Sequence, residues 1–181
     1  MKTAKQIAIL PFENMDFSQF RESLEVAGLI CGLEPTLASD FYITCDVSEV
    51  EKMRKQRDAA RVITMTAHQL READQGMKYS LLVTSQDIFA RDLDFVFGLS
   101  NGEMGAALMS TARLASWEEG LTPSRIQERI MKEAGHEIGH LRGLKHCVRT
   151  TCLMAHSNSL ELVDAKLPTF CAACSRKIGS R

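Results

Sequence analysis

The 181-residue chain has 22 Lys and Arg against 23 Asp and Glu, which gives a formal net charge of −1. Proteins that bind nucleic acid or membrane surfaces carry a basic excess, so this balance argues against both partners. Hydrophobic residues make up 45% of the chain, which is typical of a globular protein with a buried core. The longest apolar run, Ile7 to Phe12, is shorter than a membrane span or a signal-peptide core, so a cytoplasmic location is predicted.

In chain order, short runs of apolar, aromatic or β-branched residues predict strands, and apolar residues at helical spacing predict helices. The strands are expected over residues 6–12, 41–45, 79–84 and 95–99, and the helices over residues 17–29 and 58–75. Strands that alternate with helices indicate an α/β fold with a mixed sheet. The basic run over residues 52–61 is expected on a solvated helix face rather than on nucleic acid.

Residues 104–114 follow an Asn-Gly turn signal and predict a further strand, although their small side chains also suit a helix. If this segment is a strand, it can occupy one of two positions in the sheet. It either lies in the core or forms an edge beside a cleft, where an extended peptide could pair with it.

The last long helix has the clearest boundaries. Thr122 is a candidate N-cap, Pro123 suits the first helical position, and Gly143 can adopt the left-handed conformation that ends a helix. An apolar stripe marks the buried face at Ile126, Ile130, Ala134 and Ile138. The Cys-rich segment beyond Gly143 has little apolar content, so it is too small to fold by burial alone.

This helix carries a candidate metal site. His136 and His140 are four residues apart and therefore lie on one helical face, and the turn at Gly143 can bring back His146 as a third ligand. Three neutral imidazoles leave one position open, which is typical of catalytic zinc. Zinc would lower the pKa of a bound water to about 7, and Glu137 could take its proton as general base. The alternative is a surface helix whose histidines have other partners.

Four of the six cysteines form a second cluster in the C-terminal segment. They fall in two close pairs, a common layout for a structural zinc bound by four thiolates, and they are Cys147, Cys152, Cys171 and Cys174. Zinc binding would supply folding energy that the small apolar content cannot. The alternative is free buried thiols, which is the interpretation favoured for Cys31 and Cys45.

These motifs together resemble the archaemetzincin family of zinc peptidases. The resemblance covers residues 122–175 and includes the turn Cys152-Leu153-Met154. It implies a metzincin-like zincin of the α/β (α+β) class, with a twisted mixed sheet, an active-site helix and a small C-terminal subdomain. It also implies metallopeptidase activity, which in some relatives is an aminopeptidase activity on short peptides.

The resemblance also assigns a place to Met154, because metzincins have a methionine in a turn beneath the zinc. Some other metzincins have a tyrosine two residues later, where this chain has His156. We hypothesise that the His156 imidazole donates a hydrogen bond in the same cleft. The alternative is an exposed loop histidine.

We therefore predict one metallopeptidase domain over residues 1–181, divided into subdomains 1–143 and 144–181. It is expected to bind two Zn²⁺ ions, one catalytic and one structural, and to hydrolyse peptides without nucleic-acid or membrane partners. The alternative function is a zinc-stabilised binding module with little or no peptidase activity. A zinc-ribbon-like nucleic-acid binder is a third alternative, which the net charge disfavours. No oligomeric state is predicted.

Overall fold

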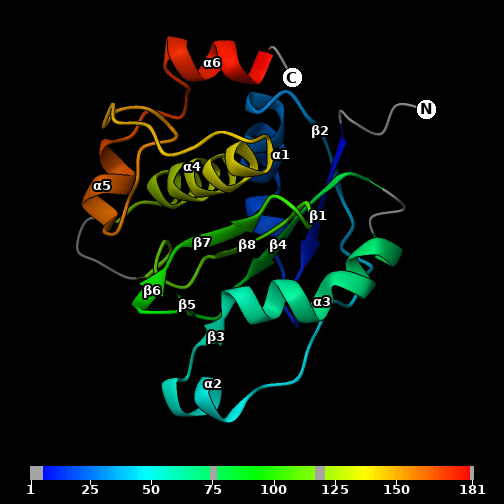
Figure 1. The fold of residues 1–181 in the computed structure, drawn as a ribbon. Coiled ribbons are helices and arrows are strands. Elements are labelled where there is room, and N and C mark those ends of the chain that lie inside the picture. Colours follow the sequence, from blue (N-terminus) through cyan, green and yellow to red (C-terminus); the bar gives the residue numbers. More distant parts are fainter. Residues whose placement is uncertain (1–5, 74–76, 117–120, 180–181) are drawn as a thin grey trace.

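The computed structural model describes residues 6–73, 77–116 and 121–179. Within these ranges, the central sheet has five strands in the order β2-β1-β4-β8-β7 (Figure 1). Strands β2 (Glu34–Leu37), β1 (Gln6–Pro11), β4 (Tyr79–Thr84) and β8 (Ala106–Ser110) are parallel, and β7 (Gly98–Asn101) runs antiparallel to β8. The mixed sheet that the sequence predicts is therefore confirmed.

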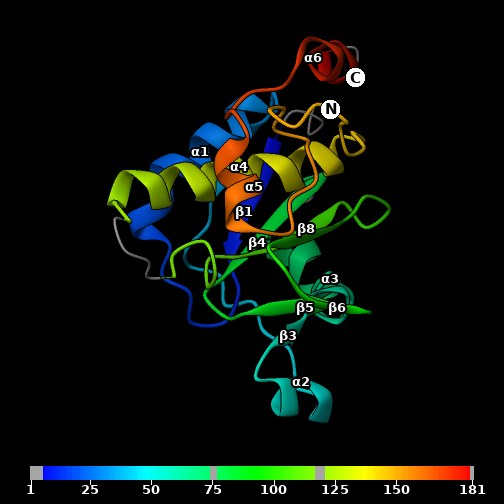
Figure 2. The same cartoon turned by 90° about the vertical axis from the view of Figure 1, so that its left-hand side faces the viewer.

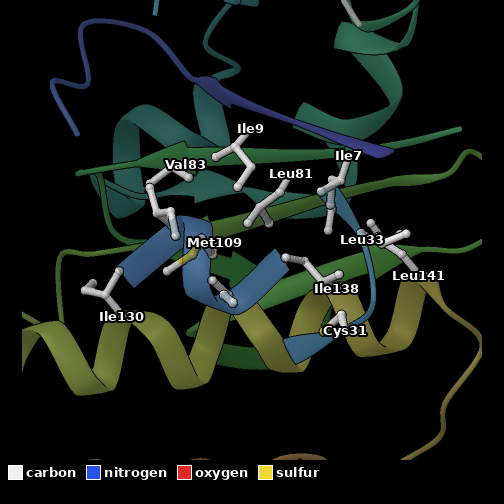
Figure 3. Packing of buried hydrophobic residues seen from close by; sticks show 14 of the residues in the cluster. Ile7, Ile9, Cys31, Leu33, Leu81, Val83, Met109, Ile130, Ile138 and Leu141 are labelled. Carbon is white, nitrogen blue, oxygen red and sulfur yellow. The ribbon is translucent and has the colours of Figure 1, made fainter. Parts of the chain in front are cut away.

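Helices cover both faces of this sheet (Figures 1 and 2). Helices α1 (Arg21–Ile30) and α4 (Pro123–Leu141) lie on one face, and α3 (Ala59–Ala73) lies on the other. In β1, Ile7 and Ile9 pack toward α1 and α4, whereas Ala8 and Leu10 belong to the core beneath α3. Figure 3 shows the first of these cores, in which Ile9, Leu81 and Met109 of the sheet face Ile130 and Ile138 of α4. The sheet is buried on both faces, as parallel sheets require.

Smaller elements surround this frame. A 3₁₀ turn, η1 (Ser18–Phe20), precedes α1. A second sheet consists of β3 (Arg57–Asp58), β5 (Ile88–Ala90) and β6 (Leu93–Val96), next to the projecting helix α2 (Glu49–Arg54). Helices α5 (Leu160–Ala165) and α6 (Ala172–Gly179) follow α4. None of the helices in the described ranges has both the length and the apolar character that a membrane crossing needs.

The predicted strands over 6–12 and 79–84 are confirmed, as are the predicted helices at α1 and α3. Residues 74–75, which the α3 prediction included, lie outside the described ranges. The strand predicted over 41–45 is wrong, because Ile43 makes only an isolated bridge to Phe12. The backbone N–H and C=O of Thr44 pair with the side chain of Gln69 instead of with a strand. The sheet is extended on that side by β2, in which Pro35 occupies an edge position that tolerates proline.

Two further strand predictions need correction. The strand predicted over 95–99 is divided between β6 and β7, which belong to different sheets and meet at Phe97. Residues 104–114 contain the shorter β8, which pairs with β4 and β7 and is therefore a core strand. The edge alternative is wrong for this segment, since the last strand of the sheet is β7.

The basic run also differs from expectation. Arg57 is buried, and its guanidinium makes ion pairs with Glu51 and Glu13. Glu51 also forms a capping box with Ser48 at the start of α2. Charge pairing therefore draws one member of the run inside the protein, where hydropathy alone would not place it.

Candidate active site

Helix α4 has the boundaries that its sequence predicts. The hydroxyl of Thr122 accepts a hydrogen bond from the backbone N–H of Arg125, and Pro123 is the first helical residue. At the other end, Gly143 has φ of 79°, a left-handed conformation that favours glycine. Its backbone N–H donates to the carbonyl of His140 at 2.8 Å. The chain reverses there and returns toward the helix with His146.

The structure brings the three predicted histidines together. One ring nitrogen from each of His136, His140 and His146 lies within 4.8 Å of the others. His136 Nδ1 is 2.9 Å from the carbonyl oxygen of Leu153, and His140 Nδ1 is 2.8 Å from that of Leu144. A carbonyl can only accept, so both Nδ1 atoms carry the proton.

These hydrogen bonds determine what the other ring nitrogens can do. The two Nε2 atoms, of His136 and His140, face each other at 3.1 Å. In the neutral rings both are unprotonated, so two lone pairs converge on one point. Burial lowers the pKa of His136 well below its ordinary value and also lowers the pKa of His140 and His146. Neutral, convergent imidazoles fit a divalent cation, and this donor set is one that zinc prefers.

Glu137 lies beside this cluster with its side chain buried. Burial raises the pKa of its carboxyl well above the ordinary range, and the neighbouring Glu133 charge adds to the effect, while a hydrogen bond with Ser100 opposes it. Its Oε2 atom has no hydrogen-bond partner among the described residues. A carboxylate held in this way can accept a proton from a water molecule in the site.

Gly98, at the start of β7, permits this placement of Glu137, and the sequence reasoning did not single it out. A Cβ atom at position 98 would lie 2.6 Å from Cγ and 2.7 Å from Oε1 of Glu137. Real Cβ contacts are not this short, so any larger residue would displace the carboxylate. The available signal was a glycine within a predicted strand, which often marks a close approach by another group.

Met154 occupies the position that the resemblance implies. Its side chain is fully buried, and its Sδ packs directly against Gly139, between the two helical histidines. The backbone carbonyl of Met154 accepts a hydrogen bond from the N–H of Cys147 at 2.8 Å. The methionine turn and the loop that carries His146 are therefore joined.

A cavity of about 460 Å³ opens over the histidines. Leu93 and residues 95–100 line it together with residues 156–158, His146 and four residues of α4, which are Glu133, His136, Glu137 and His140. The ring centroid of His156 is 4.8 Å from that of His146. His156 is an exposed loop residue, as the alternative expects, and it also lines the cavity, so its role as a donor stays a prediction.

The C-terminal cysteines form a second cluster. The Sγ atoms of Cys147, Cys152, Cys171 and Cys174 all lie within 4.8 Å of one another. The 3.8 Å separation of Cys147 and Cys171 is too long for a disulfide, at about 2.05 Å. It matches the roughly 3.8 Å expected between two sulfurs that bind one tetrahedral zinc at about 2.3 Å each. The backbone N–H of Cys174 helps to lower the pKa of Cys171 to about 6, whereas burial raises the pKa of Cys152 and Cys174.

Cys31 agrees with the interpretation as a buried free thiol, whereas Cys45 is a free thiol without full burial. Cys31 is buried, and its thiol donates to the carbonyl of Gly135 at 3.3 Å. Cys45 is half-buried beside the guanidinium of Arg57. Both lie apart from the two ligand clusters.

The fold matches those of solved archaemetzincins and of a zinc-dependent peptidase. A zinc-dependent peptidase from Methanocorpusculum labreanum matches with a TM-score of 0.81 and 26% identity, over 95% of this chain and 99% of that one. The archaemetzincin of Methanopyrus kandleri matches with a TM-score of 0.80 and 28% identity, over 98% of this chain and 95% of that one. A malonate complex of the Archaeoglobus fulgidus archaemetzincin matches with a TM-score of 0.74 and 32% identity, over 95% and 99%.

The sequence relatives identify the family. The family model described as Peptidase family M54 matches residues 41–180, and the chain belongs to this family. The curated archaemetzincin of Archaeoglobus fulgidus is 43% identical over 102 residues, which cover 56% of this chain and 61% of that protein. The archaemetzincin of Methanocaldococcus jannaschii is 44% identical over 101 residues, which cover 55% of this chain and 56% of that protein. The matched region thus spans little more than half of these relatives.

Proposed function

We propose that this chain is a zinc-dependent metallopeptidase that hydrolyses peptide bonds in the cavity over α4. The observation that carries the proposal is the convergence of two unprotonated Nε2 atoms, of His136 and His140, at 3.1 Å beside the buried carboxylate of Glu137. Membership of Peptidase family M54 supports the same activity.

The proposed ligands of the catalytic zinc are His136, His140 and His146. When bound, zinc supplies a Lewis acid that polarises a peptide carbonyl and makes a water ligand more acidic. The protein contributes the geometry. The carbonyls of Leu153 and Leu144 hold two rings in the tautomer that directs Nε2 toward the ion, and Met154 supports them from below.

Glu137 is the proposed general base. Its carboxylate accepts a proton from the attacking water and then delivers that proton to the leaving amine. Burial raises the pKa of this carboxyl, so it holds a proton more readily than an exposed glutamate does. The absence of a side chain at Gly98 leaves the space that Glu137 occupies in this orientation.

The substrate backbone has a natural place along β7. This strand is the last in the sheet, and Gly98, Leu99 and Ser100 line the cavity. An extended peptide that added to this edge would be held beside Glu137 by backbone hydrogen bonds. This role was one alternative for residues 104–114, and we now assign it to β7.

We propose a second, structural zinc at Cys147, Cys152, Cys171 and Cys174. Four thiolates leave no open position for a water molecule, so such an ion has no catalytic role. Since Cys147 follows His146 directly, the ion would hold the third histidine in place. The division into subdomains 1–143 and 144–181, the cytoplasmic location and an aminopeptidase activity on short peptides stay predictions.

The alternative is a zinc-stabilised binding module with little or no activity. Metal analysis and a peptide-library cleavage profile, run on wild type and Glu137→Ala, distinguish the two. A peptidase loses cleavage by about 10²- to 10⁴-fold in the variant and keeps its zinc. A metal-replete wild type that cleaves no peptide in the library would favour the binding module.

A further inference from the structure

A buried ion pair beside the cavity includes neither a proposed metal ligand nor the proposed general base. Glu133 on α4 and Lys166, directly after α5, are 4% and 1% exposed, and their Oε2 and Nζ atoms are 3.6 Å apart. Neither atom has a hydrogen-bond partner among the described residues. The two charges therefore balance each other. However, a buried polar atom without a hydrogen bond lowers the stability of the folded protein.

Glu133 is close enough to the proposed cleavage site to contact a bound substrate. Glu133 lies four residues before Glu137, about 6 Å along α4, and it lines the same cavity. An extended peptide advances about 3.3–3.6 Å per residue. A side chain on a residue next to the bond being cleaved can therefore reach Glu133.

The surrounding charges limit which side chain fits. Lys166 already neutralises Glu133, so a basic group would be placed next to an existing buried cation. An acidic group would face the carboxylates of both Glu133 and Glu137. An uncharged group that donates a hydrogen bond meets neither repulsion and supplies what the Glu133 carboxylate lacks.

We propose that Glu133 is a specificity-determining residue that receives an uncharged hydrogen-bond donor, such as the carboxamide of Asn or Gln, from a substrate residue flanking the scissile bond. Lys166 is a positioning residue that orients Glu133 and balances its charge. This inference rests on the proposed peptidase function. A site with an unpaired buried acceptor rejects an apolar analogue of equal size, because that acceptor stays unsatisfied.

The test uses peptides that carry Asn, Leu or Asp, which have similar shapes, at each position flanking the bond in turn. At one position, wild type should prefer Asn over both Leu and Asp by about 10- to 150-fold in kcat/KM, the range expected for a hydrogen bond to a charged group. The other position is the internal control. A preference for Leu or Asp at both positions would overturn the inference.

The matched variant replaces both partners, Glu133→Met with Lys166→Met, because exchange of a whole buried pair for apolar residues is tolerated better than loss of one member. It should keep its fold and lose the preference for Asn over Leu whatever its overall rate, because Glu133 and Lys166 also act electrostatically on Glu137 and His136. Since the comparison is a ratio within one protein, a general loss of activity does not affect it. An unchanged ratio in a folded double variant would contradict the role of Glu133.

A binding measurement separates this inference from the proposed hydrolysis. Calorimetric titration of Glu137→Ala with the same peptides should show tighter binding of the Asn peptide than of the Leu peptide. If that preference is present while wild type cleaves nothing, the proposed hydrolysis fails and the Glu133 subsite stands. If Glu137→Ala binds both peptides equally, the subsite is wrong whatever wild type cleaves.

Discussion

His136 donates a hydrogen bond from Nδ1 to the backbone carbonyl oxygen of Leu153, at 2.9 Å. Leu153 lies between Cys152 of the thiol cluster and Met154 of the methionine turn. One carbonyl therefore connects the orientation of a proposed catalytic ligand with the loop that carries a proposed structural ligand. The two ligand clusters are mechanically coupled, although each has its own donor set.

The two proposed zinc ions should differ in lability. Three imidazoles leave one site open to solvent and competing ligands, whereas four thiolates enclose the other. A mild chelator should remove one ion while the circular dichroism spectrum stays unchanged, and removal of the second ion should unfold the C-terminal segment. Protein purified under reducing conditions with a single zinc per chain would contradict the two-site proposal.

Cys171→Ser should lower stability first and activity second. The substitution removes a sulfur that lies 3.8 Å from Cys147 Sγ, so the structural ion loses a ligand. The loop with His146 then loses its anchor, and thermal unfolding should begin at a lower temperature. Cys45→Ser, at a cysteine outside both clusters, is the control and should retain wild-type zinc content. Equal zinc content in both variants would remove Cys171 from the proposed site.

Gly98→Ala should impair turnover without loss of metal. The new Cβ would lie 2.6 Å from Glu137 Cγ, so the carboxylate must move. A displacement of about 1 Å in a catalytic group can lower the rate about 10²-fold. Gly102→Ala, in the turn after β7, is the matched control because no atom lies within 4 Å of its added Cβ. If both variants have the same kcat, Gly98 does not position Glu137.

His156→Phe tests the hydrogen-bond donor in the cavity wall. The ring of His156 is 4.8 Å from that of His146, so its imidazole can reach a substrate oxygen in the cleft. Loss of one donor to a developing oxyanion lowers kcat by up to about 10²- to 10³-fold. We expect a fall in kcat with unchanged zinc content, and no effect from His68→Phe at an exposed position on α3. An unchanged kcat in His156→Phe would identify an ordinary loop histidine.

Asp164→Asn should destabilise the protein by about 3 kcal/mol, the lower end of the cost of breaking a buried ion pair. Asp164 accepts two hydrogen bonds from buried Arg129, at 2.8 and 2.7 Å. Glu25→Gln, in the exposed pair with Arg21, is the control and should cost at most about 0.5 kcal/mol. Chemical denaturation at neutral pH measures both values.

The same variant has a predictable pH dependence. The hydrogen bond from Arg129 lowers the pKa of Asp164 below its ordinary value of 3.8. The unfolded chain therefore binds this proton more readily, so the stabilisation is complete above about pH 5 and is lost as the pH falls through the lowered pKa. The stability difference between wild type and Asp164→Asn should shrink in acid. A difference that is constant down to pH 2 would exclude this carboxylate as its source.

The sequence predicts those parts of the fold that local chemistry determines. Thr122, Pro123 and Gly143 define α4 because caps and breakers act within one helical turn. The ligand spacing of the histidines and cysteines has the same local character. Their convergence in space follows from one helix and one turn, which is why the sequence anticipates it.

Features that depend on residues far apart in the chain could not be predicted from the sequence. Residues 41–45 have strand propensity, but Gln69 of α3 supplies the hydrogen bonds of Thr44 instead of a neighbouring strand. The position of β8 depends on sheet order, which no local pattern encodes. Gly98 and the Glu133–Lys166 pair are recognisable only when β7 and α5 are placed against α4.

The direct succession of His146 and Cys147 has a consequence for biosynthesis. With the thiolate cluster as the anchor of the third histidine, the catalytic centre cannot be completed until the ribosome has made the chain as far as Cys174. A nascent chain that ended between His146 and Cys174 would contain all three histidines but would lack part of the thiol cluster proposed to hold His146 in place. On the two-zinc proposal, the third histidine is therefore fixed only after the last cysteine of the cluster has been made.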